Sequence, residues 1–307
     1  MASGRRQDYE KFMEMALEEA RQSLREGNKG FGAVLVKDGQ LIDRSHDTEV
    51  TDSDPTAHAE IKLVRSAARR NHGRTLDDYA LVSTHEPCPM CTGALVWAQV
   101  SEIVYGTSIE QSKKLGRTMI DLRCEEIINR SPTRTRVVGG VLAGRCSRLY
   151  DSSVRKLVRE FRDGGPLKWQ SLGQELAKKR TAWFDENRGE IVATLGGSDL
   201  EKAYQLILKK IGVDSEEAPI TEKDEDRIVF HSENPCPALD ACEILGLDTR
   251  QVCRLHTEEA TDALIKKINP SLKFSRNYSR LRPSAPFCEE IIQLQRNGPK
   301  DETQARA

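Results

Sequence analysis

DPTAHAE at positions 54–60 and HEPCPMC at positions 85–91 are the two stretches that decide the fold expected for this chain. They place His58 two residues before Glu60 and add a Pro-Cys-x-x-Cys segment that contains Cys88 and Cys91. A neutral imidazole and two thiolates are typical ligands of Zn²⁺, and three protein ligands leave the fourth tetrahedral position for water. The spacing therefore predicts a zinc site that is open to a reactant.

Glu60 is expected to stay off the metal and to carry protons. Water on zinc ionises at a pKa of about 7 instead of about 15.7, so zinc-bound hydroxide forms without a strong base. A neighbouring carboxylate can take the proton from water, pass it to the ring nitrogen beside the attacked carbon, and then protonate the departing ammonia. One His, one unligated Glu and a Pro-Cys-x-x-Cys segment indicate zinc-dependent hydrolytic deamination.

A structural zinc site is the alternative for the same residues. Such a site would be closed by a fourth ligand, for which His85 and Cys124 are the available residues. A closed site has no need of a carboxylate beside its histidine, so the open site is favoured. Free buried cysteines are a weaker alternative, because the spacing fits a metal.

Helices and strands alternate along the first half of the chain. This order predicts an α/β sheet that begins with an antiparallel hairpin, because Asp38-Gly39 is a strong hairpin signal between two short strands. The helices are expected at 9–25, 57–70, 89–98 and 152–161, and the strands at 33–36, 41–45, 79–83, 102–105 and 136–142.

A domain boundary is expected at Asp163-Gly164-Gly165-Pro166, since two glycines and a proline end the preceding helix. The two domains would then be residues 1–162, which carry the zinc motifs, and residues 163–307. The second is expected to be a mainly helical α+β domain of uncertain role, with helices at 167–185 and 199–211, an exposed acidic connection at 215–226 and a strand at 227–231. Its irregularly spaced cysteines favour buried thiols over a metal site. They are Cys236, Cys242, Cys253 and Cys288, near His231 and His256.

The chain resembles the cytidine deaminase superfamily, and within it the guanine, cytosine and tRNA-adenosine deaminase branch. GFGAVLV at 30–36, PTAHAE at 55–60 and EPCPMCTGA at 86–94 carry the resemblance, which covers about residues 8–162. It implies a cytidine-deaminase-like mixed five-stranded sheet with flanking helices, bound zinc, catalytic Glu60 and a homodimer. A faint likeness of 269–276 and 287–289 to a family named for 2-amino-thiazoline-4-carboxylate hydrolysis transfers no residue roles.

The resemblance also implies a substrate pocket. Phe31, Ala59, Trp97 and Asp121 fall near the family's substrate-contacting positions, although Phe31 and Trp97 could equally be core residues. Asp47 departs from the family, which usually carries Asn there. An ionised Asp only accepts hydrogen bonds, so an Asp47 that faces the pocket predicts a substrate with N–H groups or positive charge. The alternative is that Asp47 caps its loop.

The composition and charge of the chain limit the kinds of partner that it is expected to bind. The 307 residues carry a net charge of −1, so bulk electrostatics does not make the chain a polyanion binder. No apolar run reaches membrane-spanning length and the first residues lack a signal-peptide core, so a cytoplasmic protein with no membrane partner is expected.

Three functions compete. The leading hypothesis is hydrolytic deamination of a small amino-substituted heterocycle, either a guanine-like base, a pyrimidine or an amino-triazine. The rival is a tRNA adenosine deaminase, because base flipping into such a pocket is known chemistry. A nucleic acid is nevertheless the less favoured partner. The third is a ligand-binding sensor whose deaminase domain is inactive, against which the intact His58, Glu60, Cys88 and Cys91 argue.

Overall fold

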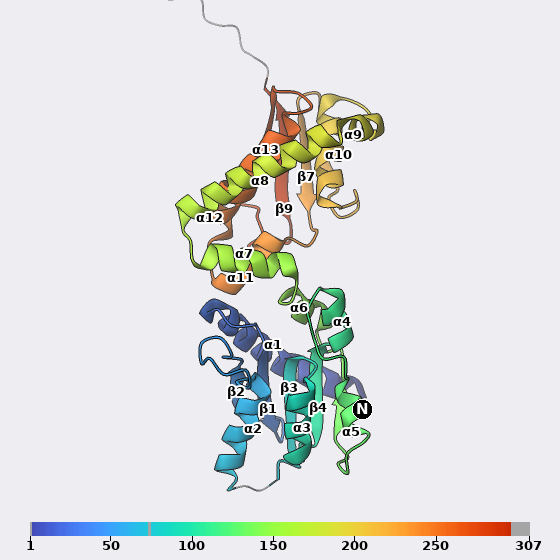
Figure 1. Cartoon of the computed structure of the whole chain (residues 1–307). Coiled ribbons are helices and arrows are strands. Elements are labelled where there is room, and N and C mark those ends of the chain that lie inside the picture. The colour runs from blue at the N-terminus through green and yellow to red at the C-terminus, as the bar shows by residue number, and fades with distance from the viewer. Residues whose placement is uncertain (1, 73–74, 296–307) are drawn as a thin grey trace, which may run out of the picture. The chain divides into compact units, whose positions relative to one another are not determined.

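The computed structural model describes residues 2–72 and 75–295, which form two units (Figure 1). The first unit ends at Arg162 and the second begins at Asp163. The division therefore falls at the start of the Asp-Gly-Gly-Pro segment.

The first unit is built on a five-stranded sheet in the order β2-β1-β3-β4-β5. Its strands are β1 (Gly32–Lys37), β2 (Gln40–His46), β3 (Tyr79–His85), β4 (Glu102–Thr107) and β5 (Arg136–Val138). β1 is antiparallel to β2 and β3, whereas β3–β4 and β4–β5 are parallel. The predicted mixed sheet is confirmed.

Helices cover both faces of this sheet (Figure 1). Ala33 and Leu35 of β1 share one buried core with Leu63 and Leu95, which lie on helices on that face. Gly32 points the other way, where a Cβ would lie 2.2 Å from the Ala16 carbonyl oxygen, so α1 can approach the strand closely. The helices are α1 (Ala2–Glu26), α2 (Ala59–Arg70), α3 (Pro89–Trp97), α4 (Ile109–Lys114), α5 (Cys124–Ile128), α6 (Ala143–Arg148) and α7 (Ser152–Arg162).

Two loops show how local sequence controls the sheet. Asp38 and Gly39 both have positive φ, 51° and 70°, as a two-residue type I′ hairpin turn requires. The strand expected over 136–142 ends at Val138, and that expectation was too long. Gly140, with φ 81°, and Leu142, with φ 50°, turn the chain into α6.

The second unit contains a four-stranded antiparallel sheet in the order β6-β7-β9-β8. Its strands are β6 (Ile220–Lys223), β7 (Arg227–Ser232), β8 (Leu272–Arg276) and β9 (Cys288–Leu294). The helices are α8 (Pro166–Glu186), α9 (Arg188–Thr194), α10 (Asp199–Ile211), α11 (Pro237–Leu245), α12 (Thr249–Cys253), the π-helix η1 (Arg254–Glu258) and α13 (Glu259–Ile265). The connection expected over 215–226 thus contains an exposed strand.

The cysteines of the second unit form no metal site among the described residues. Cys242 and Cys253 are buried, and Cys236 and Cys288 are half-buried. Across 2–72 and 75–295, no helix has both the length and the apolar character needed to span a bilayer.

Candidate metal and active site

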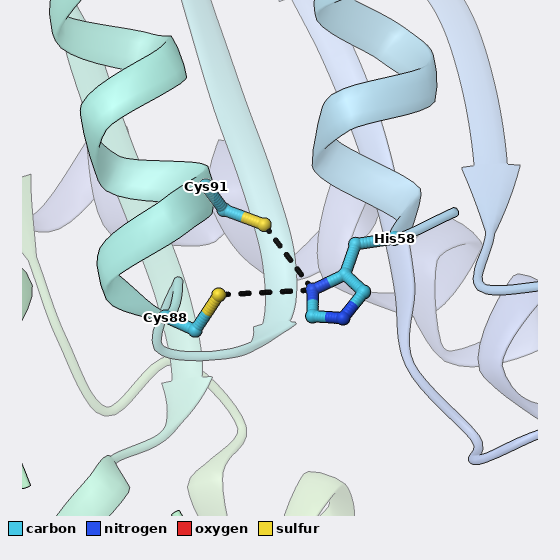
Figure 2. A group of neighbouring side chains, drawn as sticks. All are labelled: His58, Cys88 and Cys91. Carbon is cyan, nitrogen blue, oxygen red and sulfur yellow. Dashed lines mark hydrogen bonds between the residues drawn. The ribbon is translucent and has the colours of Figure 1, made fainter. Parts of the chain in front are cut away.

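The three predicted zinc ligands converge at the N-terminal ends of two neighbouring helices (Figure 2). His58 directly precedes α2, Cys88 directly precedes α3, and Cys91 lies in the first turn of α3. Pro89 occupies the first helical position, where a missing N–H costs nothing. The Nδ1 atom of His58 lies 3.3 Å from the Cys91 Sγ and 3.7 Å from the Cys88 Sγ.

These distances suit zinc. A tetrahedral ion with Zn–S near 2.3 Å and Zn–N near 2.05 Å holds its nitrogen and sulfur ligands about 3.6 Å apart. The observed separations, 3.3 and 3.7 Å, lie on either side of that value. The His58 Nε2 lies 3.5 Å from a carboxylate oxygen of Glu49, the kind of outer contact that orients a ligating imidazole. The cluster can therefore hold zinc through the His58 Nδ1.

Without metal, the three ligands share protons unequally. A hydrogen bond from Cys91 lowers the pKa of Cys88 to about 4. The same bond, together with burial, raises the pKa of the Cys91 thiol far above its usual range. A hydrogen bond with Cys88 raises the pKa of His58 to about 8. At neutral pH the metal-free site thus combines one thiolate, one thiol and one imidazolium.

At pH 7 the ligands are expected to release about two protons on zinc uptake, because the ion requires a neutral imidazole and two thiolates; ionisation of the zinc-bound water adds to this number. One proton would leave the imidazolium of His58 and one the Cys91 thiol, whereas Cys88 is already ionised. Above pH 8 the contribution of the ligands should fall toward about one, since His58 is then neutral before zinc arrives, while the zinc-bound water adds about one proton of its own. Zinc titration calorimetry in buffers of different ionisation enthalpy measures the number. A release near zero at pH 7 would contradict this proton distribution.

Glu60 lies next to the ligands but outside their cluster. Its side chain is buried, one oxygen accepts a hydrogen bond from the Ser83 hydroxyl at 3.1 Å, and the other accepts one from the Cys91 thiol at 3.5 Å. Burial raises the pKa of this carboxyl. A carboxyl with a raised pKa holds a proton more readily than an ordinary carboxyl, which favours a role as a proton carrier.

A cavity of about 310 Å³ opens onto this cluster, and its lining includes His58, Glu60 and Cys88. That volume is at the lower end for ligand pockets, so it suits a small molecule. Phe31 also lines the cavity and packs against His85 and Tyr150, with ring centroids 5.3 Å apart in each of the three pairs.

His85 is no fourth ligand in this structure. Its Nδ1 lies 2.7 Å from the Glu86 carbonyl oxygen and its Nε2 lies 2.6 Å from the Ser112 hydroxyl. Burial lowers the pKa of His85 to about 4, so the ring is neutral. Cys124 is also outside the metal cluster. Within residues 2–72 and 75–295, the ligand cluster thus consists of His58, Cys88 and Cys91 alone.

Glu86 lies beside the metal ligands and holds two backbone segments in place. No functional role was predicted for it from the sequence, although it stands inside the HEPCPMC motif. The buried carboxylate of Glu86 accepts the backbone N–H of Ile109 at one oxygen and that of Cys124 at the other, both at 2.9 Å. These bonds fix both ends of the segment that contributes Arg117 to the cavity wall. Lys29 and Glu49, which form an ion pair at 2.7 Å, are further lining residues that had no sequence signal.

Some of the predicted substrate residues line the cavity beside the ligand cluster, and others lie elsewhere. Phe31 lines the cavity, whereas the side chain of Ala59 packs in the core. Trp97 is 88% exposed and lines a different cavity, of about 610 Å³, together with Ile127. Asp121 is exposed and forms an ion pair with Lys113. Trp97, Asp121 and Asp47 are therefore not part of the lining beside the metal in this chain.

Asp47 holds a loop. Its side chain is fully buried, one oxygen accepts bonds from the Ser23 hydroxyl and the Phe31 N–H at 2.6 and 2.8 Å, and the other accepts the Lys29 N–H at 2.9 Å. A carboxylate suits this place better than an amide, because all three partners donate. The direct substrate contact predicted for Asp47 has no geometric support, and the loop-capping alternative describes it.

Asp47→Asn is expected to lower the free energy of unfolding by about 1–3 kcal/mol, because an amide NH₂ at this buried position would face the backbone N–H of Lys29. The ranking of substrates should stay unchanged. Urea unfolding and ammonia release from a panel of heterocycles measure the two effects. Asp121→Asn is the matched control, and it should change neither. A reordered substrate ranking for Asp47→Asn would return this side chain to the pocket.

Comparison with known proteins decides the family. The family model described as the cytidine and deoxycytidylate deaminase zinc-binding region matches residues 6–107. A tRNA-specific adenosine deaminase of Bacillus subtilis (strain 168) is 33% identical over 151 residues, which are 49% of this chain and 91% of that protein. The chain belongs to the cytidine and deoxycytidylate deaminase family. The resemblance to the cytidine deaminase superfamily described from the sequence is confirmed, and the protein is a zinc-dependent deaminase that cleaves C–N bonds by hydrolysis.

Further relatives cover a similar part of the chain. A guanine deaminase of the same organism is 37% identical over 110 residues, which are 36% of this chain and 70% of that protein. A solved structure from a study of A-to-I editing by tRNA:A34 deaminases is 29% identical, with a TM-score of 0.39, and covers 45% of this chain and 97% of its own. The first of these similarities leaves about two thirds of this deaminase unmatched, and the second leaves about half.

Proposed function

We propose that the first unit deaminates a small amino-substituted heterocycle, either a guanine-like base, a pyrimidine or an amino-triazine. The observation that carries the proposal is the placement of Glu60. Its buried carboxyl lies beside the three ligand residues, and Glu60, His58 and Cys88 line the same cavity of about 310 Å³. A structural zinc site has no use for this combination.

Zinc held by His58, Cys88 and Cys91 would bind and acidify the attacking water. Glu60 takes the proton of that water and gives it to the ring nitrogen beside the attacked carbon. The same carboxyl then takes the proton of the newly added hydroxyl and gives it to the amino group, which leaves as ammonia while the carbonyl forms. The Ser83 hydroxyl holds the carboxyl in place through its 3.1 Å hydrogen bond, and Phe31 supplies an apolar wall for the ring.

A tRNA adenosine is the second candidate substrate, because a tRNA-specific adenosine deaminase is among the relatives. The basic side chains along α7 would then meet phosphates. They are Arg155, Lys156, Arg159 and Arg162. The net charge of −1 weighs against a large polyanion, and the small cavity favours a free base.

Ammonia release by the purified, zinc-loaded full chain tests these proposals. Guanine, cytosine, amino-triazines, their nucleosides and an adenosine-containing tRNA form the panel, and metal-depleted protein is the control. Release from a free base at a higher kcat/KM than from tRNA supports the first proposal. Release from tRNA alone would establish the second candidate. No release from any compound, with zinc bound, would favour the sensor with an inactive deaminase domain.

We further propose that the protein acts as a cytoplasmic homodimer. Trp97 is 88% exposed beside an apolar cavity on α3, and covering such a side chain would favour association. A partner's Trp97 could then reach a base that this chain's own Trp97 does not touch. Sedimentation equilibrium of wild type and Trp97→Ala tests the dimer. A monomeric wild type at micromolar concentration would contradict it.

A further inference from the structure

Arg117 enters the metal cavity from the loop that follows α4. The helix ends in a Schellman motif, in which the Gly116 N–H bonds to the Lys113 carbonyl at 2.9 Å and the Arg117 N–H bonds to the Ser112 carbonyl at 3.1 Å. Gly116 has φ 80°, as the motif requires. The Ser112 hydroxyl in turn contacts His85 at 2.6 Å. The backbone of Arg117 is thus fixed relative to the cavity wall.

The guanidinium of Arg117 rests on two aromatic rings. Its central carbon lies 4.7 Å from the Phe31 ring centroid and 5.3 Å from that of Tyr150. The Nη1 atom is buried, and no hydrogen-bond acceptor for it lies among residues 2–72 and 75–295. Burial lowers the pKa of Arg117, but an arginine stays charged in proteins. A buried donor that lacks an acceptor is costly, so an acceptor on a bound molecule that reaches this guanidinium would be favoured.

The nearby carboxylates do not supply that acceptor. The negative charges of Asp47 and Glu49 act on Arg117. Asp47 is occupied by a hydroxyl and two backbone N–H groups, and Glu49 lies between Lys29 and His58. The positive charge of Arg155 adds to that of Arg117. This end of the cavity therefore favours an electron-rich group.

We propose that Arg117 selects substrates with two adjacent acceptors, a carbonyl oxygen beside an unprotonated ring nitrogen, on the edge away from the amino group under attack. A planar guanidinium pairs in this way with O6 and N7 of guanine. Adenine has no carbonyl oxygen, so Arg117 would favour an oxo-purine over adenosine. The inference rests on the proposed function and names the substrate feature that the site recognises.

Two purine pairs test the proposal on zinc-loaded full chain. Guanine and 2-aminopurine differ in the 6-oxo group and the N1 proton that accompanies it, and they measure turnover. Hypoxanthine and purine differ in the same way and measure binding without the 2-amino group. Arg117→Met is expected to lower the guanine to 2-aminopurine ratio of kcat/KM by about 10- to 100-fold, the value of one bidentate pair. In calorimetry it should remove the preference for hypoxanthine over purine.

Two further variants separate recognition from folding. Arg117→Lys keeps the charge but not the planar fork, so it should also lose most of the discrimination. Arg69→Met, an exposed position in the last turn of α2, should leave both ratios unchanged. The proposal would be overturned if Arg117→Met left both ratios unchanged. This would include an equal loss of kcat/KM for guanine and 2-aminopurine together with an equal loss of affinity for hypoxanthine and purine. A different result would separate the two proposals. If the preference for hypoxanthine depended on Arg117 but no base released ammonia, the proposed reaction would be overturned and the proposed recognition would stand.

Discussion

Replacing Glu60 with Gln is expected to lower kcat by about 10²- to 10⁴-fold, the usual contribution of a general acid–base group. The amide keeps the size of the side chain and can still bond to the Ser83 hydroxyl, which lies 3.1 Å from the carboxylate in the wild type. It cannot take up a proton from water, so attack and ammonia departure both slow. Zinc content should stay the same, because the ligand cluster consists of His58, Cys88 and Cys91. Ammonia release and metal analysis on the same preparation measure the two effects.

Glu110→Gln is the control for this experiment. Glu110 is an exposed carboxylate on α4 that pairs with Lys114 at 2.8 Å, so its replacement should change kcat little. A Glu60→Gln protein that keeps its kcat within a few-fold of wild type would remove the proton carrier from the mechanism. Loss of zinc from this variant would show that the carboxylate serves the metal instead.

The parts of the fold that could be predicted are those whose signals are local. The hairpin turn needs two consecutive residues with positive φ, and the pair Asp38-Gly39 is one that favours this conformation. The metal ligands could be predicted because residues of the zinc motif also mark the starts of helices. Cys88 and Pro89 mark the start of α3, and His58 stands just before α2, so the chemistry and the helix ends coincide.

The parts that could not be predicted depend on distant partners. β9 was missed because its neighbours are β7, about 60 residues earlier, and β8, across a long loop. β6 has only exposed residues and no alternating pattern. The role of Asp47 follows from donors at Ser23, Lys29 and Phe31, which the fold alone brings together. Arg117 looks in sequence like any basic residue in a charged loop.

Cys91→Ala is expected to abolish stable zinc binding, because it leaves only one imidazole and one thiolate of a three-residue ligand set. In wild type, free zinc at 100 times its dissociation constant should stabilise the folded chain by about 2.7 kcal/mol. The variant should show no zinc-dependent shift of Tm. Metal analysis after gel filtration and thermal unfolding with and without zinc measure both effects, and treatment of wild type with a chelator should reproduce the metal-free curve.

Cys124→Ala makes this prediction decisive, because Cys124 is as fully buried as Cys91 but lies outside the ligand cluster. Both replacements remove one buried sulfur, so their effects on the metal-free protein should be similar. Only Cys91→Ala should lose the zinc-dependent rise in Tm, since the Cys91 Sγ lies 3.3 Å from the His58 Nδ1. If Cys124→Ala also lost zinc, the ion would have a fourth protein ligand. The position needed by the attacking water would then be filled, and the hydrolytic mechanism would fail for this site.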